Sequence, residues 1–269
     1  MKRVSLVAVI LALGWSTAVV AGAPGTMRVD YFHSGNQATE MFSLDQVVIE
    51  PLPWTGNMAQ PLDKTSRGKY LFEIVDPASG DIAWSRSFSS IYGEWETTGE
   101  ARRINRSMHE SVRFPAQESP FQLVIKKRGP GNVFVEVWRI ELDPSDVLVH
   151  RESAMFAEHV VAIHESGDPA TKVDLLLMGD GYTAEEQQAY IAKARELTEI
   201  LFATSPFKER MNDFNVWAVA PPAARSGVSL PSTGVFRDSP IGTTYDAFRS
   251  ERYVLTFDNK SMRRIASSA

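Results

Sequence analysis

The feature that most constrains the fold is a change in the period of the hydrophobic pattern near the middle of the chain. From about Met27 to Asp143, apolar and polar residues alternate with a period of two, in short runs that are separated by turns. Because successive side chains of a strand point to opposite faces, this pattern predicts about seven short strands and no convincing helix. The first half, residues 26–143, is therefore expected to be a β-sandwich of antiparallel sheets.

The second half alternates strand-like and helix-like segments. Val173–Met178 is apolar almost throughout, which is typical of a strand that is buried on both faces. The other predicted elements are a helix over Ala184–Phe202, strands over Phe214–Val219 and Tyr253–Phe257, and a second helix from Ser261. This alternation indicates an α/β domain with a largely parallel sheet over residues 151–269. The whole chain is thus expected to be an α+β protein of two domains.

The first residues read as a signal peptide. Lys2 and Arg3 precede the apolar run Leu6–Val20, which is short for a membrane span, and small residues favour cleavage after Ala21. We therefore predict a signal peptide over residues 1–21 and an exported protein, periplasmic or extracellular, without a membrane segment after cleavage. An uncleaved anchor is the alternative. Cysteine is absent, so the core must be stable without disulfides.

The remaining composition excludes some classes of function. The formal net charge of -5 argues against a nucleic-acid partner, which usually requires a basic face. His164 begins a stretch similar to a zinc-binding helix motif, but its fifth residue is Asp168, and the glycine and proline around it are incompatible with a helix. The other histidines lack metal-ligand spacing, and Ser226 lacks the glycine pattern of a nucleophile elbow. We assign no catalytic residue and no metal ligand in this chain, and expect it to bind no catalytic zinc.

The stretch LLLMGDGYTAEE joins the buried strand to the first long helix. Thr183 and Glu186 fit a capping box at the start of that helix. The acidic turn has the wrong charge and glycine spacing for a phosphate, and it lacks the ligand spacing of a calcium loop. Two interpretations stay open. Either the turn is purely structural, or Asp180 and Tyr182 lie at the carboxyl end of a parallel strand, where clefts form in α/β proteins.

Six motifs follow one another along the chain. They are MRVDYFHSG (Met27–Gly35), ESVRFP (Glu110–Pro115), LLLMGDGYTAEE (Leu175–Glu186), PFKERMNDFNVWAV (Pro206–Val219), SGVSLPSTG (Ser226–Gly234) and ERYVLT (Glu251–Thr256). Together they resemble the IgA-peptidase family of secreted zinc metallopeptidases, peptidase family M64. The resemblance runs from about Thr26 to the last residue. It implies an amino-terminal β-sandwich, an α/β metallopeptidase domain, and a protein or peptide substrate whose peptide bonds are hydrolysed by zinc-activated water.

The chain departs from this family at the place where the chemistry occurs. In such enzymes a His-Glu-x-x-His helix supplies two zinc ligands and the general base. No histidine of this chain matches that motif, so the resemblance implies that zinc binds in the full-length enzyme after residue 269, and that this chain is a fragment. Ser229 stands where the family pattern has an acidic residue. The candidate cleft-lining residues are Asp180, Tyr182, Ser226 and Ser229.

The alternative function is that of a non-catalytic, exported β-sandwich that binds glycan or protein. Trp54, Trp84 and Trp95 are the candidate exposed aromatic residues for such a surface, and core packing is the competing interpretation. A nucleotide site at Gly179–Gly181 is a third and weaker hypothesis. The peptide specificity does not follow from the sequence, and the resemblance does not make immunoglobulin a substrate.

Overall fold

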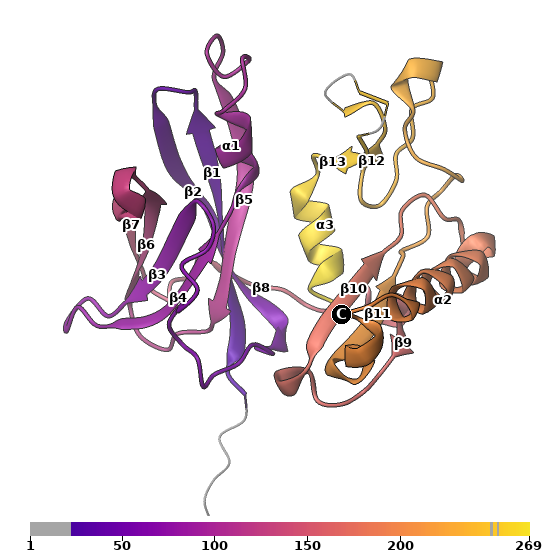
Figure 1. Cartoon of the computed structure of the whole chain (residues 1–269), viewed down its shortest axis with the longest axis horizontal. Helices are drawn as coiled ribbons and strands as arrows, with labels where there is room; N and C mark the ends of the chain where they lie inside the picture. The colour runs from indigo at the N-terminus through magenta and orange to yellow at the C-terminus, as the bar shows by residue number, and fades with distance from the viewer. Residues whose placement is uncertain (1–22, 248–249, 252) are drawn as a thin grey trace, which may run out of the picture.

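The computed structural model describes residues 23–247, 250–251 and 253–269, and the predicted signal peptide lies outside these residues. Figure 1 shows two domains side by side. A strand-rich domain, coloured indigo to magenta, is formed by residues up to 151, and a mixed domain of strands and helices follows from residue 160. We call them the sandwich domain and the second domain.

The sandwich domain contains seven strands between residues 25 and 142, in agreement with the period-two pattern. Its elements are β1 (Gly25–Gly35), β2 (Glu40–Pro53), β3 (Tyr70–Val75), β4 (Ile82–Phe88), α1 (Ile91–Trp95), β5 (Arg106–Pro115), β6 (Phe121–Arg128) and β7 (Phe134–Leu142). The short helix α1 contradicts the expectation that this half has no helix. The strands form two sheets, β5-β1-β2 and β4-β3-β6-β7, and every pairing among them is antiparallel.

An eighth strand joins the two domains. β8 (Val149–Arg151) pairs in parallel with β2 at the edge of the first sheet. It lies in the segment that connects β7 with the second domain, so the first sheet takes in residues beyond 143.

The two sheets enclose one continuous core. Met27, Val29 and Tyr31 alternate along β1 and are fully buried, and they share a cluster with residues of the opposite sheet such as Ile74 and Leu123. Burial of a large apolar side chain stabilises a fold by about 1.5–3 kcal/mol, so this cluster is the main source of stability in the domain.

The three tryptophans proposed as an exposed surface belong to packed regions. Trp84 is 2% exposed and Trp95 is 5% exposed, so the expectation that they are exposed is wrong. Trp54 is half-buried against the sandwich core, with its ring 5.4 Å from that of Trp84. Large aromatic side chains contribute most of their stabilisation when buried, and that effect decides their position here.

The second domain is built on a three-stranded sheet in the order β10-β11-β9. Its strands are β9 (Val160–His164), β10 (Val173–Met178) and β11 (Phe214–Val219). β10 and β11 are parallel, whereas β9 is antiparallel to β11, so the sheet is mixed and not largely parallel. The reason is the short connection between β9 and β10, because a parallel arrangement needs a crossover of a dozen or more residues.

A separate pair of short strands follows. β12 (Thr243–Thr244) and β13 (Leu255–Thr256) are antiparallel. The strand predicted over Tyr253–Phe257 is therefore reduced to two residues, and it lies outside the main sheet.

Two helices cover the two faces of the main sheet. α2 (Gln187–Ala203) packs Tyr190 and Ala194 against Ala218, and α3 (Asn259–Ala266) packs Met262 and Ile265 against the opposite face. α3 starts two residues before the predicted position, because the side chain of Asp258 caps it by accepting a hydrogen bond from the amide of Ser261 at 3.0 Å.

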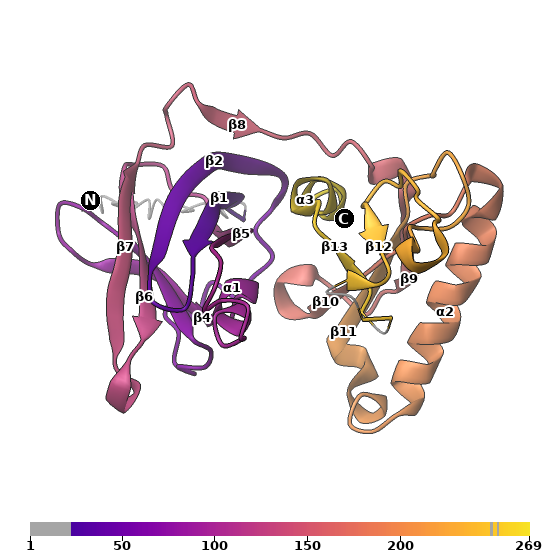
Figure 2. The same ribbon diagram turned by 90° about the horizontal axis from the view of Figure 1, so that it is seen from above.

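Figure 2 places α3 between the sandwich domain and the sheet of the second domain. The outward face of β1 is buried beneath it. Arg28 and Asp30 alternate with the core residues of β1, yet they are only 1% and 0% exposed. Both faces of β1 are thus covered, one by apolar packing and the other by a charged interface between the domains.

Short 3₁₀ helices complete the described chain. They are η1 (Pro130–Asn132), η2 (Ala157–His159), η3 (Pro169–Thr171), η4 (Ala184–Glu186), η5 (Lys208–Asp213) and η6 (Pro231–Thr233). Across the described ranges, no helix is both long enough and apolar enough to cross a bilayer.

Candidate functional site

The largest cavity of the described chain lies where the two domains meet. Its volume is about 1050 Å³, and one wall is formed by α1 and the residues after it, including Ile91, Glu94 and Trp95. The other wall is formed by the C-terminal loops, which we define as residues 231–247 and 253–257, and which contribute Tyr245 and Phe257. We call this cavity the interdomain cleft.

The walls of the interdomain cleft combine exposed apolar groups with charged groups. Ile91 is 44% exposed, Tyr245 41% and Phe257 63%. The carboxylate of Glu100 accepts hydrogen bonds from the Arg106 guanidinium at 2.8 and 2.9 Å and from Nε1 of Trp95 at 2.7 Å. These bonds, the one from Arg106 first, lower the pKa of Glu100 to about 2. The cleft is therefore large, partly apolar and lined on one side by a fixed ion pair.

The position of α1 follows from its few residues. The side chain of Ser90 accepts a hydrogen bond from the amide of Gly93 and begins the helix. Tyr92 and Trp95 are buried beneath it, and the hydroxyl of Tyr92 donates to the backbone carbonyls of Asn36 and Thr39. The opposite side of α1 carries Ile91, which consequently faces the cleft.

His33 supports α1 from within the sandwich. Its ring is stacked against Tyr92 at 3.7 Å, and its Nδ1 and Nε2 lie 3.2 and 3.1 Å from carboxylate oxygens of Glu110 and Glu40. Because carboxylates only accept hydrogen bonds, both ring nitrogens carry a proton and His33 is charged. Burial alone lowers the pKa of His33, but the bonds to Glu110 and Glu40 outweigh it and hold that pKa above the usual 6.5.

The turn after β10 acts behind the interdomain cleft. The carboxylate of Asp180 accepts hydrogen bonds from the amides of Gly181, Ile241 and Thr243 at 3.0, 3.1 and 2.9 Å, and from the hydroxyl of Ser239 at 2.7 Å. These bonds fix the segment that leads into β12 and the cleft wall. Of the two interpretations of the turn, the structural one accounts for every printed contact of the Asp180 side chain.

The glycines of this turn are required by close packing. A Cβ on Gly179 would lie 2.4 Å from the ring of Tyr190, and one on Gly181 would lie 2.6 Å from the backbone of Gly227. Gly181 also has a φ of +76°, which disfavours other residues. The capping box is confirmed, with the amide of Thr183 donating to Glu186 at 2.9 Å.

The other predicted site residues surround this turn. The ring of Tyr182 lies 5.1 Å from that of Tyr190, and the hydroxyl of Ser226 donates to Glu186 at 2.8 Å. The hydroxyl of Ser229 accepts from the amide of Arg237 at 2.9 Å. Neither of the two cavities described here is lined by Asp180, Tyr182, Ser226 or Ser229. Their role as cleft-lining residues stays a prediction.

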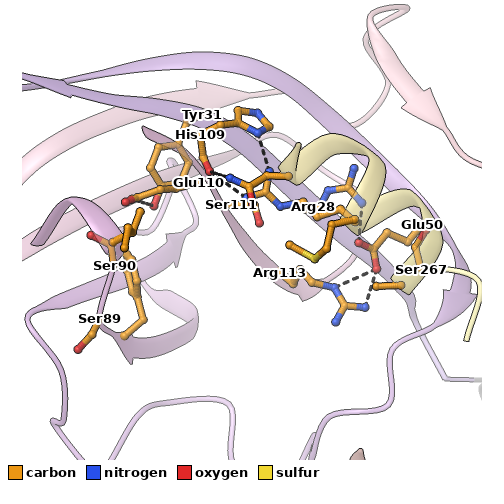
Figure 3. A pocket seen from close by; sticks show the side chains of 16 residues that line it. Arg28, Tyr31, Glu50, Ser89, Ser90, His109, Glu110, Ser111, Arg113 and Ser267 are labelled. Atoms are coloured by element: carbon orange, nitrogen blue, oxygen red, sulfur yellow. Dashed lines mark hydrogen bonds and ion pairs between the residues drawn. The ribbon is translucent and has the colours of Figure 1, made fainter. Parts of the chain in front are cut away.

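A second cavity of about 450 Å³ lies between β5, β1, β2 and α3 (Figure 3). Charged groups on its walls are paired with one another. The Arg28 guanidinium contacts Asp30, Glu50 and Glu152 at 2.9, 2.9 and 3.1 Å, and Arg113 contacts Glu50 at 2.6 Å. Burial alone lowers the pKa of Arg28, but the bonds with Asp30 and Glu152 raise it further, so Arg28 stays charged.

Sequence reasoning missed this charged interface. A period-two strand with charged residues on one face is usually exposed to solvent on that face. The available signal was that Arg28 and Asp30 in β1 alternate with core residues, while oppositely charged Glu50 lies on the neighbouring strand. Such a signal identifies complementary charges, but it does not distinguish a covering domain from water.

One group of side chains within the described ranges has the spacing of metal ligands. Ligand atoms of Asp30, Asp45 and His109 lie within 4.8 Å of one another. Each is already paired with a cation or a donor, because Arg28 contacts Asp30, Lys260 contacts Asp45 at 2.7 Å, and Arg263 donates to Nδ1 of His109 at 2.8 Å. Zinc would have to displace three positive groups, so this cluster does not fit a zinc site.

Comparison with known proteins agrees with the two-domain architecture. Residues 161–269 match the family described as IgA Peptidase M64, and residues 21–139 match the domain described as Peptidase M64 N-terminus. The interval between the two matches contains β8, where the chain passes from one domain to the other. A search of curated proteins found no match. Because both parts match in order and over most of the chain, this protein belongs to the IgA peptidase M64 family.

Proposed function

We propose that this chain forms the substrate-binding frame of an exported zinc metallopeptidase that hydrolyses peptide bonds in proteins. Membership of a metallopeptidase family supports a protein or peptide substrate. The observation that carries the proposal at the level of structure is the interdomain cleft of about 1050 Å³. Pockets for small ligands commonly range over about 300–1,000 Å³, so this cleft has room for an extended peptide segment.

The chemistry of the cleft walls suits a peptide. An extended peptide presents side chains on alternate sides, and the cleft offers apolar groups such as Ile91 from the sandwich domain and Tyr245 from the second domain. Glu94 and Arg103 add one acidic and one basic group on the sandwich side. On this proposal, both domains contact the substrate, and the sandwich domain is part of the recognition surface.

The zinc of such an enzyme would be held outside the residues printed here. A His-Glu-x-x-His sequence does not occur in residues 1–269, and the cluster around His109 does not fit a metal. We therefore derive no catalytic step from this chain and assign it no zinc ligand. When bound in a metallopeptidase, zinc supplies a Lewis acid that activates water at neutral pH.

Activity measurements with the product of the complete reading frame test the proposal. That product should contain a His-Glu-x-x-His sequence and cleave quenched fluorescent casein, and 1,10-phenanthroline should abolish the cleavage. Residues 22–269 alone should bind casein without cleaving it, and should hold no stoichiometric zinc. A complete reading frame without that sequence, or cleavage insensitive to the chelator, would refute the assignment.

Export has its own test. Expression in a bacterial host should yield a mature protein outside the cytoplasm whose first residue is Gly22, as determined by amino-terminal sequencing. An intact amino terminus in the cytoplasmic fraction would contradict the predicted signal peptide.

A further inference from the structure

His109 lies at the contact between the two domains. It belongs to β5, and its side chain is one of those drawn in Figure 3. Nδ1 of its ring is 2.8 Å from Nη1 of Arg263 on α3, and Nε2 is 3.2 Å from Oδ2 of Asp45 on β2. The ring therefore bridges a strand of the sandwich domain and a helix of the second domain.

These two contacts determine the protonation state of His109. A guanidinium only donates hydrogen bonds, so Nδ1 must present a lone pair to Arg263. A carboxylate only accepts, so Nε2 must carry the proton that is donated to Asp45. His109 is consequently neutral in this arrangement, and its tautomer is fixed. His33, bonded to two carboxylates, is in the opposite state.

Charged groups face His109 from every element packed against it. They are Arg28 and Asp30 on β1, Asp45 on β2, Glu110 beside it on β5, and Lys260 and Arg263 on α3. A proton on Nδ1 would remove the acceptor of the Arg263 bond and place a positive charge 2.8 Å from the guanidinium. Burial, and then the charge of Arg263, lower the pKa of His109 below the usual 6.5.

The contacts of α3 with the sandwich domain converge on this histidine. The side chain of Asn259 donates to the backbone carbonyl of His109 at 3.0 Å, and Nη2 of Arg263 donates to the same carbonyl at 3.2 Å. Lys260 contacts Asp45, the partner of Nε2, at 2.7 Å. The other side of α3 carries Met262 and Ile265, which pack on the sheet of the second domain. Loss of the His109 contacts would therefore release the second domain together with α3.

We propose that His109 is a proton-sensitive latch between the two domains. Neutral His109 holds α3 against the sandwich domain, and protonation of its ring releases α3 and widens the interdomain cleft. Interfaces between domains of one chain commonly permit relative motion, and this one is predominantly polar. The inference goes beyond the proposed peptidase function and does not depend on it.

The direction of the pH effect follows from linkage. The latched form binds a proton on His109 less readily than the released form, in which the ring regains an ordinary environment. The latch is therefore complete above pH 6.5, and it weakens as pH falls below 6.5 and through the lowered pKa of His109.

Distance measurements across the cleft test the latch. The chain has no cysteine, so the changes Thr97→Cys and Ser232→Cys allow two spin labels to be placed next to the cleft-lining residues Thr98 and Pro231. Pulsed electron paramagnetic resonance should give one short distance at about pH 7.5. A longer distance should increase several-fold in population at about pH 5, with the far-UV circular dichroism unchanged.

The matched control is His109→Gln. A glutamine offers a carbonyl to Arg263 and an amide to Asp45 and does not titrate, so its distance distribution should be the same at both pH values. An unchanged distribution for the parent protein, a full pH response in His109→Gln, or a longer distance that appears only with loss of secondary structure would each overturn the proposal.

Nitrogen-15 NMR of the histidine rings tests the same inference without depending on a variant of His109. The ring of His109 should be the neutral Nε2–H tautomer at about pH 7.5 and should gain its second proton only below pH 6.5. The change Arg263→Gln should move that titration towards 6.5. A charged ring at pH 7.5, or the Nδ1–H tautomer, would contradict the latch.

Discussion

The two domains differ in what holds them together. The sandwich domain has one continuous apolar core to which all seven of its strands from β1 to β7 contribute. The second domain has two small clusters on opposite faces of a three-stranded sheet, and most residues of its β10 are only half-buried. The comparison teaches that the sandwich domain depends on apolar burial, whereas the second domain depends more on its docked helices and on polar contacts across the interface.

The two buried histidines of the interface region extend this contrast. His33 is charged and lies within the sandwich, where it supports α1. His109 is neutral and lies on the opposite side of the same sheet, where it contacts α3. One imidazole thus stabilises a domain internally as a cation, and the other joins two domains as a neutral group.

The largest expected effect concerns the charged interface. The change Arg28→Met leaves Asp30, Glu50 and Glu152 without their shared cation in a buried region, and it should lower the free energy of unfolding by about 3–5 kcal/mol. Urea unfolding measures this effect. The matched control is Arg139→Met, because Arg139 pairs with Glu136 at 42% exposure and its loss should cost no more than about 1 kcal/mol. Equal effects of the two changes would show that the interface contributes little.

The next effect compares the two cores. The change Leu123→Ala creates a cavity in the sandwich core and should cost about 2–5 kcal/mol. Leu176→Ala removes the same atoms from a half-buried position of β10, so it should cost clearly less. Both are measured by urea unfolding followed by circular dichroism. A larger loss for Leu176→Ala would reverse the comparison between the domains.

A smaller effect is expected at the turn behind the cleft. The change Asp180→Asn replaces an oxygen that accepts hydrogen bonds with an amide that donates, and should cost about 1–3 kcal/mol. Hydrogen exchange should increase at residues 239–243 and remain unchanged in the sandwich domain. Asp238→Asn, at an exposed position of the same segment, is the control and should have no such effect. Unchanged exchange in Asp180→Asn would remove the structural role of this carboxylate.

The smallest expected effect is the pH dependence contributed by His33. Its pKa is raised in the folded protein, so the folded state holds the proton more strongly than the unfolded state does. The resulting stabilisation is complete below pH 6.5 and is lost as pH rises through the raised pKa. Thermal unfolding of His33→Gln should lack this loss. A parent protein whose melting temperature does not fall over that pH range would contradict the charged state of His33.

Part of this fold was predictable from local patterns. The alternation along β1 and β6 predicted strands because one face of each is buried in a single core. The start of α2 was predicted because Thr183 and Glu186 form a capping box that depends only on neighbouring residues. Such features are decided within a few positions of the chain.

Other features depend on tertiary contacts and could not be predicted in this way. The direction of β9 follows from the length of its connection to β10, and α1 is too short to show a hydrophobic period. The charged face of β1 is covered by a helix more than two hundred positions away in the sequence, and local alternation of Arg28 and Asp30 does not reveal that cover. The interdomain cleft was missed for the same reason.

The central claim is that the interdomain cleft binds an extended peptide. Its most direct test is the affinity of residues 22–269 for fluorescein-labelled β-casein, measured by fluorescence anisotropy. Ile91 on the cleft wall and Ile82 on β4 are 44% and 40% exposed, so the changes Ile91→Arg and Ile82→Arg form a matched pair. The account predicts that Ile91→Arg weakens binding by about tenfold, which corresponds to about 1.4 kcal/mol, and that Ile82→Arg leaves it unchanged. Equal affinities for the two variants would contradict the claim.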